Sequence, residues 1–480
     1  KITKTDIVVG QASDIVTLDP AGQQDTTSGV LMKHAYSTLL DVDNEGKVVP
    51  DLAESYEMKS DTEYVFKLRE DACFWDGTPV TAQDVKFSLD RAKGMPKTKS
   101  NTSKIEEVTV NGDHEVTIKL TEPYAAFKTI VTQHNLSILS EKAVTEAGDS
   151  YGDVDNLLGS GPFKVTEWVP NDHYTLVRND NYWGEMPIAT SITCRVIPEG
   201  SARTIALEAG EIDVVWSVDP TDCANVESNP DVKLLSQPST GIDYVGMNTQ
   251  KEKFSDKRVR QAINYALDKQ AFVDTIIEGR GLVANSYINA AIPGWTDEVE
   301  AYPYDPEKAK ELLAEAGYPD GFECSIFVNG DLRTRSAQIL QAQLADVGIK
   351  VDISTYEWGA LLDTLNAGEH EMFLLGWSNT SFDPDGSTYQ LFYSGNHGAT
   401  GNRAFFSNDK VDELILSAQR ESEESKRMEL YKELQFVLHE ESPWCPLYYK
   451  ENNVGVRADL KGFTLHAGAQ HYLGNCHYEE

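Results

Sequence analysis

Residues 333–353 read RTRSAQILQAQLADVGIKVDI, and this stretch decides the fold class. It predicts a helix over residues 333–347, a break at Gly348 and a strand over residues 349–353. A helix that leads through a single glycine into a strand is typical of α/β folds. We therefore expect an α/β fold, at least in this part of the chain.

The same alternation of helix and strand extends upstream in the second half of the chain. Residues 305–317 combine an Asp-Pro start, apolar residues at helical spacing and a closing glycine, which predicts another helix. Ser201 is expected to cap a helix that ends at Ala209, and a strand is expected over residues 212–216. This pattern favours a series of α/β units.

The first part of the chain instead predicts mostly strands and turns. Residues 64–68 alternate between apolar and polar side chains, the pattern of a half-buried strand. Asn111-Gly112 suits the positive φ angles of a tight hairpin, and residues 163–177 indicate a second hairpin. Because the pattern changes near residues 248–249, we expect two lobes, and a crevice between lobes is where small ligands usually bind.

The composition is that of a soluble globular protein with a strong negative charge. The chain has 480 residues, of which 40% are hydrophobic and 25% are charged. This length corresponds to several packing units of roughly 100–200 residues each. The net charge of −35 repels nucleic acid and anionic lipid headgroups, so no nucleic-acid partner is expected. A well-solvated surface explains the charge, and a weak attraction for cationic ligands is the alternative interpretation.

The cysteines and the first residues of the chain say little about metal binding, disulfide bridges or export. None of the six cysteines forms a CxxC pair, which argues against a zinc ribbon or a thioredoxin-like redox site. Buried free thiols and disulfide bridges both remain open. No stretch approaches the roughly 18–20 apolar residues of a membrane span. The chain begins at Lys1 without a signal-peptide pattern, which we interpret as a mature or a trimmed form.

Motifs that carry catalysis are missing from the sequence. It has no phosphate-binding loop, no complete dinucleotide fingerprint and no GxSxG elbow. His439 opens a zincin-like stretch, but Pro443 stands where the second histidine belongs. We interpret His471, Cys476 and His477 as an ordinary surface tail rather than as metal ligands. The expectation is a binding protein without enzyme activity, metal or cofactor.

Five groups of segments occur along the chain in a characteristic order. They are residues 52–57 with 64–69 and 74–85, residues 159–163 with Trp168 and 179–183, Asn248 with 259–268, residues 305–321, and residues 356–385. Together they resemble, in the same order, one family of ABC importer receptors, the extracellular solute-binding proteins of family 5, which is the large peptide, nickel and oligopeptide class. The ordered set covers most of the chain and is far more specific than any segment alone.

The resemblance implies a two-lobed α/β fold of the periplasmic-binding-protein-like type II, with an additional β-rich subdomain in the first lobe. Two crossing strands are expected near residues 245–250 and 455–462. The implied parts are lobe I at residues 1–45, the extra subdomain at 46–159, lobe I again at 160–247, lobe II at 248–458 and a return to lobe I at 459–480.

The function implied by the resemblance is solute capture for an ABC importer. Such a receptor closes about a hinge on a di- or oligopeptide, or on a modified peptide such as glutathione, and delivers it to permease subunits. The ATPase acts only indirectly. We expect an exported monomer in the periplasm or on the outer face of the cell membrane, held there by a lipid anchor.

Candidate ligand residues come from the same resemblance. In similar peptide receptors two tryptophans 19 positions apart line the cleft, and Trp358 and Trp377 match both type and spacing. Aromatic faces offer apolar area of defined geometry to varied side chains. Gly376 and Ser378 flank Trp377 and are expected to offer backbone groups to an extended peptide that joins as an added strand.

The sequence departs from its relatives at the ionic anchors. Thr380 stands where peptide receptors usually carry an Asp for the α-amine, and residues 327–329 lack the Arg that binds the carboxylate in dipeptide receptors. A buried ammonium without a partner is costly, so either Asp383 or Asp385 binds the amine or the ligand has none. Arg403 is a candidate for a bidentate carboxylate contact, and its segment looks closer to the glutathione-type branch.

Two other functions stay open beside peptide import. One is a receptor of the same fold for a sugar, an opine or a metal chelate, since the ionic anchors are missing. The other is a chemosensory binding protein that reports its ligand to a membrane partner without transport. Permease and ATPase genes next to the coding gene would favour import.

Overall fold

The computed structural model describes all 480 residues and divides them into two compact units. Strands β13 (Val232–Met247) and β18 (Trp444–Arg457) both run from one unit into the other. Unit 1 comprises Lys1–Val218, Asp222–Ser236 and Asn453–Glu480, and unit 2 comprises Asp219–Thr221 and Gln237–Asn452. The finer division into five parts stays a prediction.

Unit 1 contains a mixed sheet in which the end of β18 is followed by β12, β2, β11, β10 and β9. Strands β9 and β10 pair antiparallel, which confirms the predicted hairpin over residues 163–177. Buried apolar side chains such as Val9, Phe163 and Ile192 fill the core of this part. The strands are β2 (Asp6–Gln11), β9 (Phe163–Val169), β10 (His173–Arg178), β11 (Ser191–Val196) and β12 (Val214–Val215), and the helices α1 (Thr26–Ala35), α4 (Glu141–Ala147) and α5 (Gly200–Glu208).

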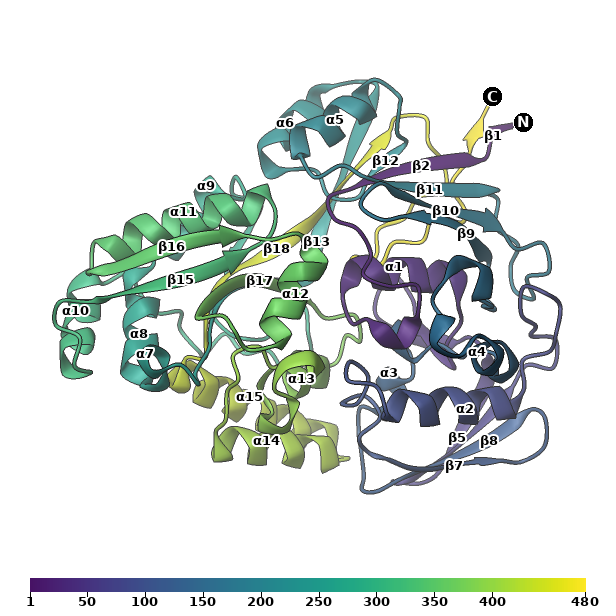
Figure 1. The fold of residues 1–480 in the computed structure, drawn as a ribbon, viewed down its shortest axis with the longest axis horizontal. Coiled ribbons are helices and arrows are strands. Elements are labelled where there is room, and N and C mark those ends of the chain that lie inside the picture. The colour runs from purple at the N-terminus through teal and green to yellow at the C-terminus, as the bar shows by residue number, and fades with distance from the viewer. The chain divides into compact units, whose positions relative to one another are not determined.

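A second sheet in unit 1 has its own core around Phe66 and Val116. Its strand order is β5-β6-β8-β7, and helix α2 packs against β7 and β8 (Figure 1). Asn111 donates its N–H to the Glu115 carbonyl at 2.9 Å and Gly112 has φ +87°, which confirms the predicted hairpin. The elements are β5 (Ala53–Ser60), β6 (Glu63–Leu68), β7 (Ile105–Val110), β8 (Glu115–Leu120), α2 (Ala82–Lys93) and α3 (Phe127–Ile130).

Unit 2 contains a sheet of order β16-β15-β17-β13-β18, with β14 also paired to β18. Helix α11 packs against β15, β16 and β17 on one face. The strands are β14 (Gly281–Val283), β15 (Phe322–Val328), β16 (Ile349–Thr355) and β17 (Met372–Ser378). The main helices are α8 (Lys257–Ala266), α9 (Lys269–Thr275), α10 (Pro306–Glu315), α11 (Asp331–Ala345), α12 (Trp358–Asn366), α14 (Asp409–Arg420) and α15 (Glu424–Glu441).

The short elements complete the description of both units. They are β1 (Ile2–Lys4), β3 (Leu40–Val42), β4 (Val48–Pro50), β19 (Tyr478–Glu479), α6 (Pro220–Ser228), α7 (Glu252–Ser255) and α13 (Tyr389–Phe392). No helix of the chain has both the length and the apolar character that crossing a membrane requires.

The predicted α/β units of the second half are confirmed. The helix predicted over residues 333–347 is α11, Gly348 follows with φ +90°, and β16 begins at the next residue. Helix α10 begins after Asp305, whose carboxylate accepts the N–H of Lys308 at 3.0 Å. In both cases the local signals that end or begin a helix lie at the observed boundaries.

Near residue 200 one local prediction was wrong and another was confirmed with shorter bounds. Helix α5 begins at Gly200 with Glu199 at its cap, and Ser201 lies inside the first turn, where its hydroxyl donates to the Glu199 carboxylate. The guanidinium of Arg203 donates to the carbonyl of Ile197 at 2.8 Å, which fixes the entry of the chain into the helix. The strand predicted over residues 212–216 is reduced to Val214–Val215.

Candidate functional site

Strand β17 lies inside the sheet of unit 2 but is paired along only part of one edge. It pairs antiparallel with β13 over its whole length, from Met372 to Ser378. On its other edge β15 pairs with Met372 and Phe373 only, because β15 ends at Val328 and the chain turns into α11. The last part of β17 therefore has no strand on that edge.

The register shows which backbone groups face this open edge. Asn379 donates its N–H to the carbonyl of Thr240 across the β13 side. Backbone groups alternate in direction along an antiparallel pair, so Trp377 also faces β13. Gly376 and Ser378 direct their N–H and C=O groups to the opposite edge, where no strand pairs with them. These groups are available to an extended ligand.

The two candidate tryptophans pack against the same apolar core of unit 2. This core contains Tyr244 and Trp444, whose rings stack with centroids 3.4 Å apart. Trp377 is half-buried against it and donates its indole N–H to the Gly386 carbonyl at 2.9 Å. Trp358 begins α12 and is also half-buried against this core. The structure thus brings both tryptophans to the edges of one cluster, while their role in binding stays a prediction.

The turn that follows β17 is organised by Asn379, which is 1% exposed. Its amide N–H₂ donates to the Asp383 carbonyl at 2.7 Å, and its oxygen accepts the N–H groups of Ser381 and Phe382. Thr380 lies half-buried inside this turn. These hydrogen bonds give the turn a defined shape, while the ligand role predicted for Thr380 stays a prediction.

The carboxylates of Asp383 and Asp385 face an internal cation. Asp383 accepts two hydrogen bonds from the Arg427 guanidinium, at 2.9 and 2.5 Å, and also caps the short helical turn that begins at Pro384. Asp385 is 2% exposed and accepts a hydrogen bond from Gln419 at 2.9 Å. An amine would have to share these carboxylates with Arg427, so the amine role predicted for either residue remains a prediction.

Arg403 lies in the loop that follows the short helix α13. It is 5% exposed, and its Nε donates to the side-chain oxygen of Asn366 at 3.1 Å. Its backbone carbonyl contacts the His370 ring at 2.6 Å. These contacts anchor the loop to α12, and the carboxylate contact expected for Arg403 stays a prediction.

A charged cluster that the sequence did not reveal lies beside Gly376. Asp243 on β13 is 1% exposed and accepts hydrogen bonds from Arg333 at 3.2 and 3.3 Å and from the Tyr448 hydroxyl at 3.2 Å. Lys450 Nζ lies 3.2 Å from the same carboxylate. Burial by itself raises the pKa of Asp243, but the positive charges of Arg333 and Lys450 hold it down at about 2.

These cluster residues come from three elements, α11, β13 and β18, and are separated by up to about 200 positions in the sequence. No spacing rule links them. The only local signal is an Asp at position 243 in a strand that is otherwise apolar from Ile242 to Val245. A charge in such a strand is rarely buried without partners, so it points to a buried ion pair.

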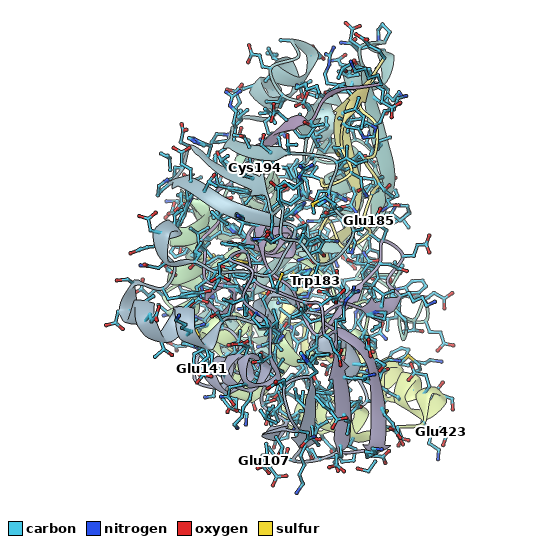
Figure 2. All side chains as sticks on the ribbon, turned by 90° about the vertical axis from the view of Figure 1, so that its right-hand side faces the viewer. Glu107, Glu141, Trp183, Glu185, Cys194 and Glu423 are labelled. Carbon is cyan, nitrogen blue, oxygen red and sulfur yellow. The ribbon has the colours of Figure 1, made fainter.

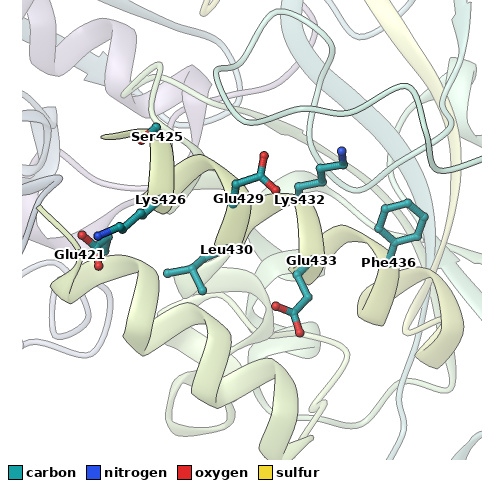
Figure 3. Close-up of a pocket in the computed structure, with 8 residues that line it drawn as sticks. All are labelled: Glu421, Ser425, Lys426, Glu429, Leu430, Lys432, Glu433 and Phe436. Carbon is teal, nitrogen blue, oxygen red and sulfur yellow. The ribbon is translucent and has the colours of Figure 1, made fainter. Parts of the chain in front are cut away.

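The cysteines, the metal-ligating side chains and the surface depression along α15 do not form a second candidate site. The six cysteines are free, and all except the half-buried Cys73 are buried. No group of three metal-ligating side chains is present in the chain. An open depression of about 690 Å³ lies along α15, lined by Glu429, Lys432 and Phe436 among others (Figure 3). Its side chains of both signs lie on a helix surface and converge on no common point.

The chain matches the model of the bacterial extracellular solute-binding proteins, family 5, over residues 47–399. It is 32% identical over 479 residues to the glutathione-binding protein GsiB of Shigella boydii, a match that covers 96% of this chain and 92% of the relative.

Two solved structures are similar along the whole chain. The periplasmic binding protein DppA of Helicobacter pylori, in complex with the peptide STSA, is 28% identical with a TM-score of 0.93 and covers 99% of this chain and 98% of its own. The protein AgaA of A. tumefaciens, in complex with agropinic acid, is 27% identical with a TM-score of 0.92 and covers 99% of both chains. The fold is the predicted two-lobed type II fold of periplasmic binding proteins, and the chain belongs to the bacterial extracellular solute-binding proteins of family 5.

Proposed function

We propose that this protein is the solute receptor of an ABC importer and binds a small peptide or a peptide-like molecule such as glutathione. The observation that carries the proposal is the open edge of β17, where Gly376 and Ser378 present backbone donors and acceptors. An extended peptide gains main-chain hydrogen bonds when it adds to such an edge, whatever its side chains are. The half-buried indoles of Trp358 and Trp377 supply apolar contact nearby.

Binding in this proposal works by closure of the two units on the ligand. A ligand that contacts both units stabilises the closed arrangement and shifts the population toward it. The strands β13 and β18, which pass between the units, provide the covalent path about which such a rotation occurs. No bond of the ligand is made or broken in this cycle.

The partners follow from the same proposal. Permease subunits receive the ligand from the closed receptor, and a separate ATPase supplies the energy. The receptor acts outside the cytoplasmic membrane, in the periplasm or on the outer face of the cell, where a lipid anchor holds it. Relatives named for glutathione binding and for complexes with a peptide support this assignment.

A second candidate ligand class is an opine or a related acidic conjugate. Thr380 stands where an α-amine partner is expected, and Asp383 is occupied by Arg427. A ligand without a free amine at that position avoids an unpaired ammonium. The similar protein AgaA, solved in complex with agropinic acid, supports this alternative.

Thermal-shift screening of the purified protein tests the ligand class. The panel contains di- to tetrapeptides, glutathione, opines, sugars and nickel chelates. A ligand that binds only the folded state stabilises it by about 2.7 kcal/mol at 100 times its dissociation constant, which raises the melting midpoint. We expect shifts with peptides or glutathione. Shifts with sugars or chelates alone would contradict the proposal.

Trp377→Ala is expected to weaken binding of the ligand found in that screen by about tenfold or more, because it removes an aromatic contact beside the open strand edge. Isothermal titration calorimetry measures the change, and circular dichroism should show an intact fold. Trp183→Ala is the matched control, since Trp183 also donates its indole N–H to a backbone carbonyl, that of Ser160 at 2.8 Å, but lies in unit 1. Equal affinity of Trp377→Ala and wild type would remove Trp377 from the site.

A further inference from the structure

We propose that Arg333 and Lys450 form a carboxylate-binding subsite beside Gly376, so that the ligand carries a carboxylate where it passes the end of β17. This inference deepens the proposed function and rests on it, because it places the ligand along the open edge of that strand. The main ionic contact is then between these two cations and a carboxylate of the ligand. It takes the place of the Asp that binds the ligand amine in similar peptide receptors and that this chain lacks.

The first argument is the balance of charge in the cluster. Asp243 supplies one negative charge, while Arg333 and Lys450 supply two positive charges. Arg333 alone, with the Tyr448 hydroxyl, already gives both carboxylate oxygens of Asp243 a partner. One cation is therefore in excess in a partly desolvated place, and a carboxylate from outside the chain would balance it.

The second argument is that donors of both cations remain unused. Arg333 directs Nε and Nη2 at Asp243, and its Nη1 has no acceptor in the chain. Lys450 Nζ contacts only Asp243 among the acidic groups. The side chains of Arg333 and Lys450 are 19% and 31% exposed, while that of Asp243 is 1% exposed. Both cations are therefore more accessible than the carboxylate that they share.

The third argument is the space left by two glycines. A Cβ on Gly376 would clash with Arg333 Nη2, and it would lie 2.7 Å from the carboxylate oxygen of Asp243 that these cations neutralise and 3.2 Å from Lys450 Nζ. A Cβ on Gly241, which pairs with Ser378 across the two strands, would lie 2.5 Å from Lys450 Cε. The glycines allow both cations to lie directly against the backbone of β17. A carboxylate of a strand bound at Gly376 and Ser378 then meets them at close range.

The charge of the whole molecule makes such a local anchor necessary. A net charge of −35 repels an anionic ligand at long range. A charge-assisted hydrogen bond to Arg or Lys in a partly buried place is short-ranged and strong enough to hold the carboxylate. Salt screens the long-range repulsion more than the contact itself. The affinity for a carboxylate ligand should therefore not fall steeply as the salt concentration rises.

Matched probe pairs test the subsite by calorimetry. The probes are glutathione and its diethyl ester, and the tetrapeptide STSA as free acid and as C-terminal amide. For each pair that binds, wild type is expected to bind the probe with the free carboxylate at least about tenfold more tightly than the ester or amide. The glycyl monoethyl ester of glutathione, which keeps only the γ-glutamyl carboxylate, shows which of the two carboxylates occupies the subsite.

Lys450→Met is the key variant, because it leaves Asp243 paired with Arg333 and Tyr448. It should reduce the preference for the acid form by about tenfold and leave the affinity for the neutral form nearly unchanged. Lys253→Met is the matched control, since Lys253 pairs with Glu371 at 3.0 Å and has a side chain that is 36% exposed. The control should keep the full preference, and both variants should melt close to wild type.

The outcomes separate the two proposals. Equal binding of acid and neutral probes by wild type, or an unchanged preference in Lys450→Met, overturns the carboxylate subsite and leaves the peptide receptor standing. Failure of these probes and of every peptide in the thermal-shift panel to bind wild type overturns the proposed function, and the subsite with it. Loss of preference in Lys450→Met but not in Lys253→Met supports the inference.

Discussion

At the scale of single residues, unit 2 uses acidic side chains to fix its turns. Asp383 caps the turn after β17 and binds Arg427, whose side chain is 3% exposed. The same residue was a candidate for the ligand amine, because from the sequence an Asp after the second tryptophan suggests that role. The sequence could not show that an arginine 44 positions away supplies the cation.

Arg427→Leu is expected to destabilise the protein by about 3–5 kcal/mol, because it leaves the carboxylate of Asp383 without its buried partner. Urea unfolding followed by circular dichroism measures the free energy of unfolding. The double variant Arg427→Leu with Asp383→Asn should recover part of the loss, since the unpaired charge is gone while the side-chain oxygen that caps the turn remains. No recovery in the double variant would mean that the ion pair is not the source of the loss.

Candidate residues could be predicted where a short sequence motif matches the family. They could not be predicted where residues far apart in the sequence meet only in the fold. Trp358 and Trp377 were predicted from the family resemblance, whose pattern they match in residue type and spacing; the structure places both against one core, and their role in binding stays a prediction. Asp243, Arg333 and Lys450 were not found, because three elements bring them together. Only the strand register of β13, β17 and β18 and the packing of α11 create that cluster.

At the scale of elements, helix and hairpin boundaries followed sequence signals most closely. Helix α10 begins at Pro306, directly after its cap Asp305, and Gly348 lies between α11 and β16, as predicted. At α5 the predicted cap at Ser201 was wrong, because the cap is Glu199, two residues earlier, where the contacts of Arg203 hold the entering chain. The partial pairing of β17 depends on where β15 ends, which no local pattern reports.

Helix α2 begins with a reciprocal cap. The hydroxyl of Thr81 accepts the N–H of Asp84, and the carboxylate of Asp84 accepts the N–H of Thr81 at 2.9 Å. Thr81→Ala removes one of these bonds and is expected to cost about 1 kcal/mol of unfolding free energy, measured by urea titration. Thr364→Ala, at a half-buried position in the interior of α12 that caps no helix end, should cost little or nothing. Equal losses in both variants would contradict a specific capping effect.

At the scale of the whole molecule, the fold could be predicted because family-like segments occur in order along the chain. The α/β character, the two-lobed type and the receptor family all follow from that order, and the comparisons confirm them. The composition also predicts an acidic surface, and exposed carboxylate side chains such as Glu107 and Glu185 lie in unit 1 (Figure 2). Composition alone could not show which titratable groups are buried.

The buried histidines predict how stability depends on pH. Burial lowers the pKa of His34, His134, His370, His466 and His471 to values between about 2 and about 4. In the unfolded chain these rings have pKa values near 6.5, so the unfolded state binds more protons below that pH. The stability is fully present above about pH 6.5 and is lost as the pH falls toward 4.

The free energy of unfolding should therefore drop by several kcal/mol between pH 7 and pH 5, at about 1.4 kcal/mol per pH unit for each such ring. Urea unfolding across this range measures the slope. His173→Gln is the control, because the pKa of His173 is raised by hydrogen bonds from its ring to Asp172 and Glu167 at the surface. A raised pKa adds stability at low pH and so opposes the effect of the buried rings, so removing this ring should not flatten the slope. A flat profile for wild type would show that the histidines are protonated in the folded protein.

The open edge of β17 has a further consequence for the empty receptor. A strand edge that accepts a guest peptide also accepts a strand from another copy of the same chain, which is the first step of edge-to-edge aggregation. Mutual repulsion between copies that each carry a charge of −35 keeps them apart at low ionic strength. At high salt this protection weakens, and a ligand bound along β17, as proposed above, would then prevent self-association by covering the edge.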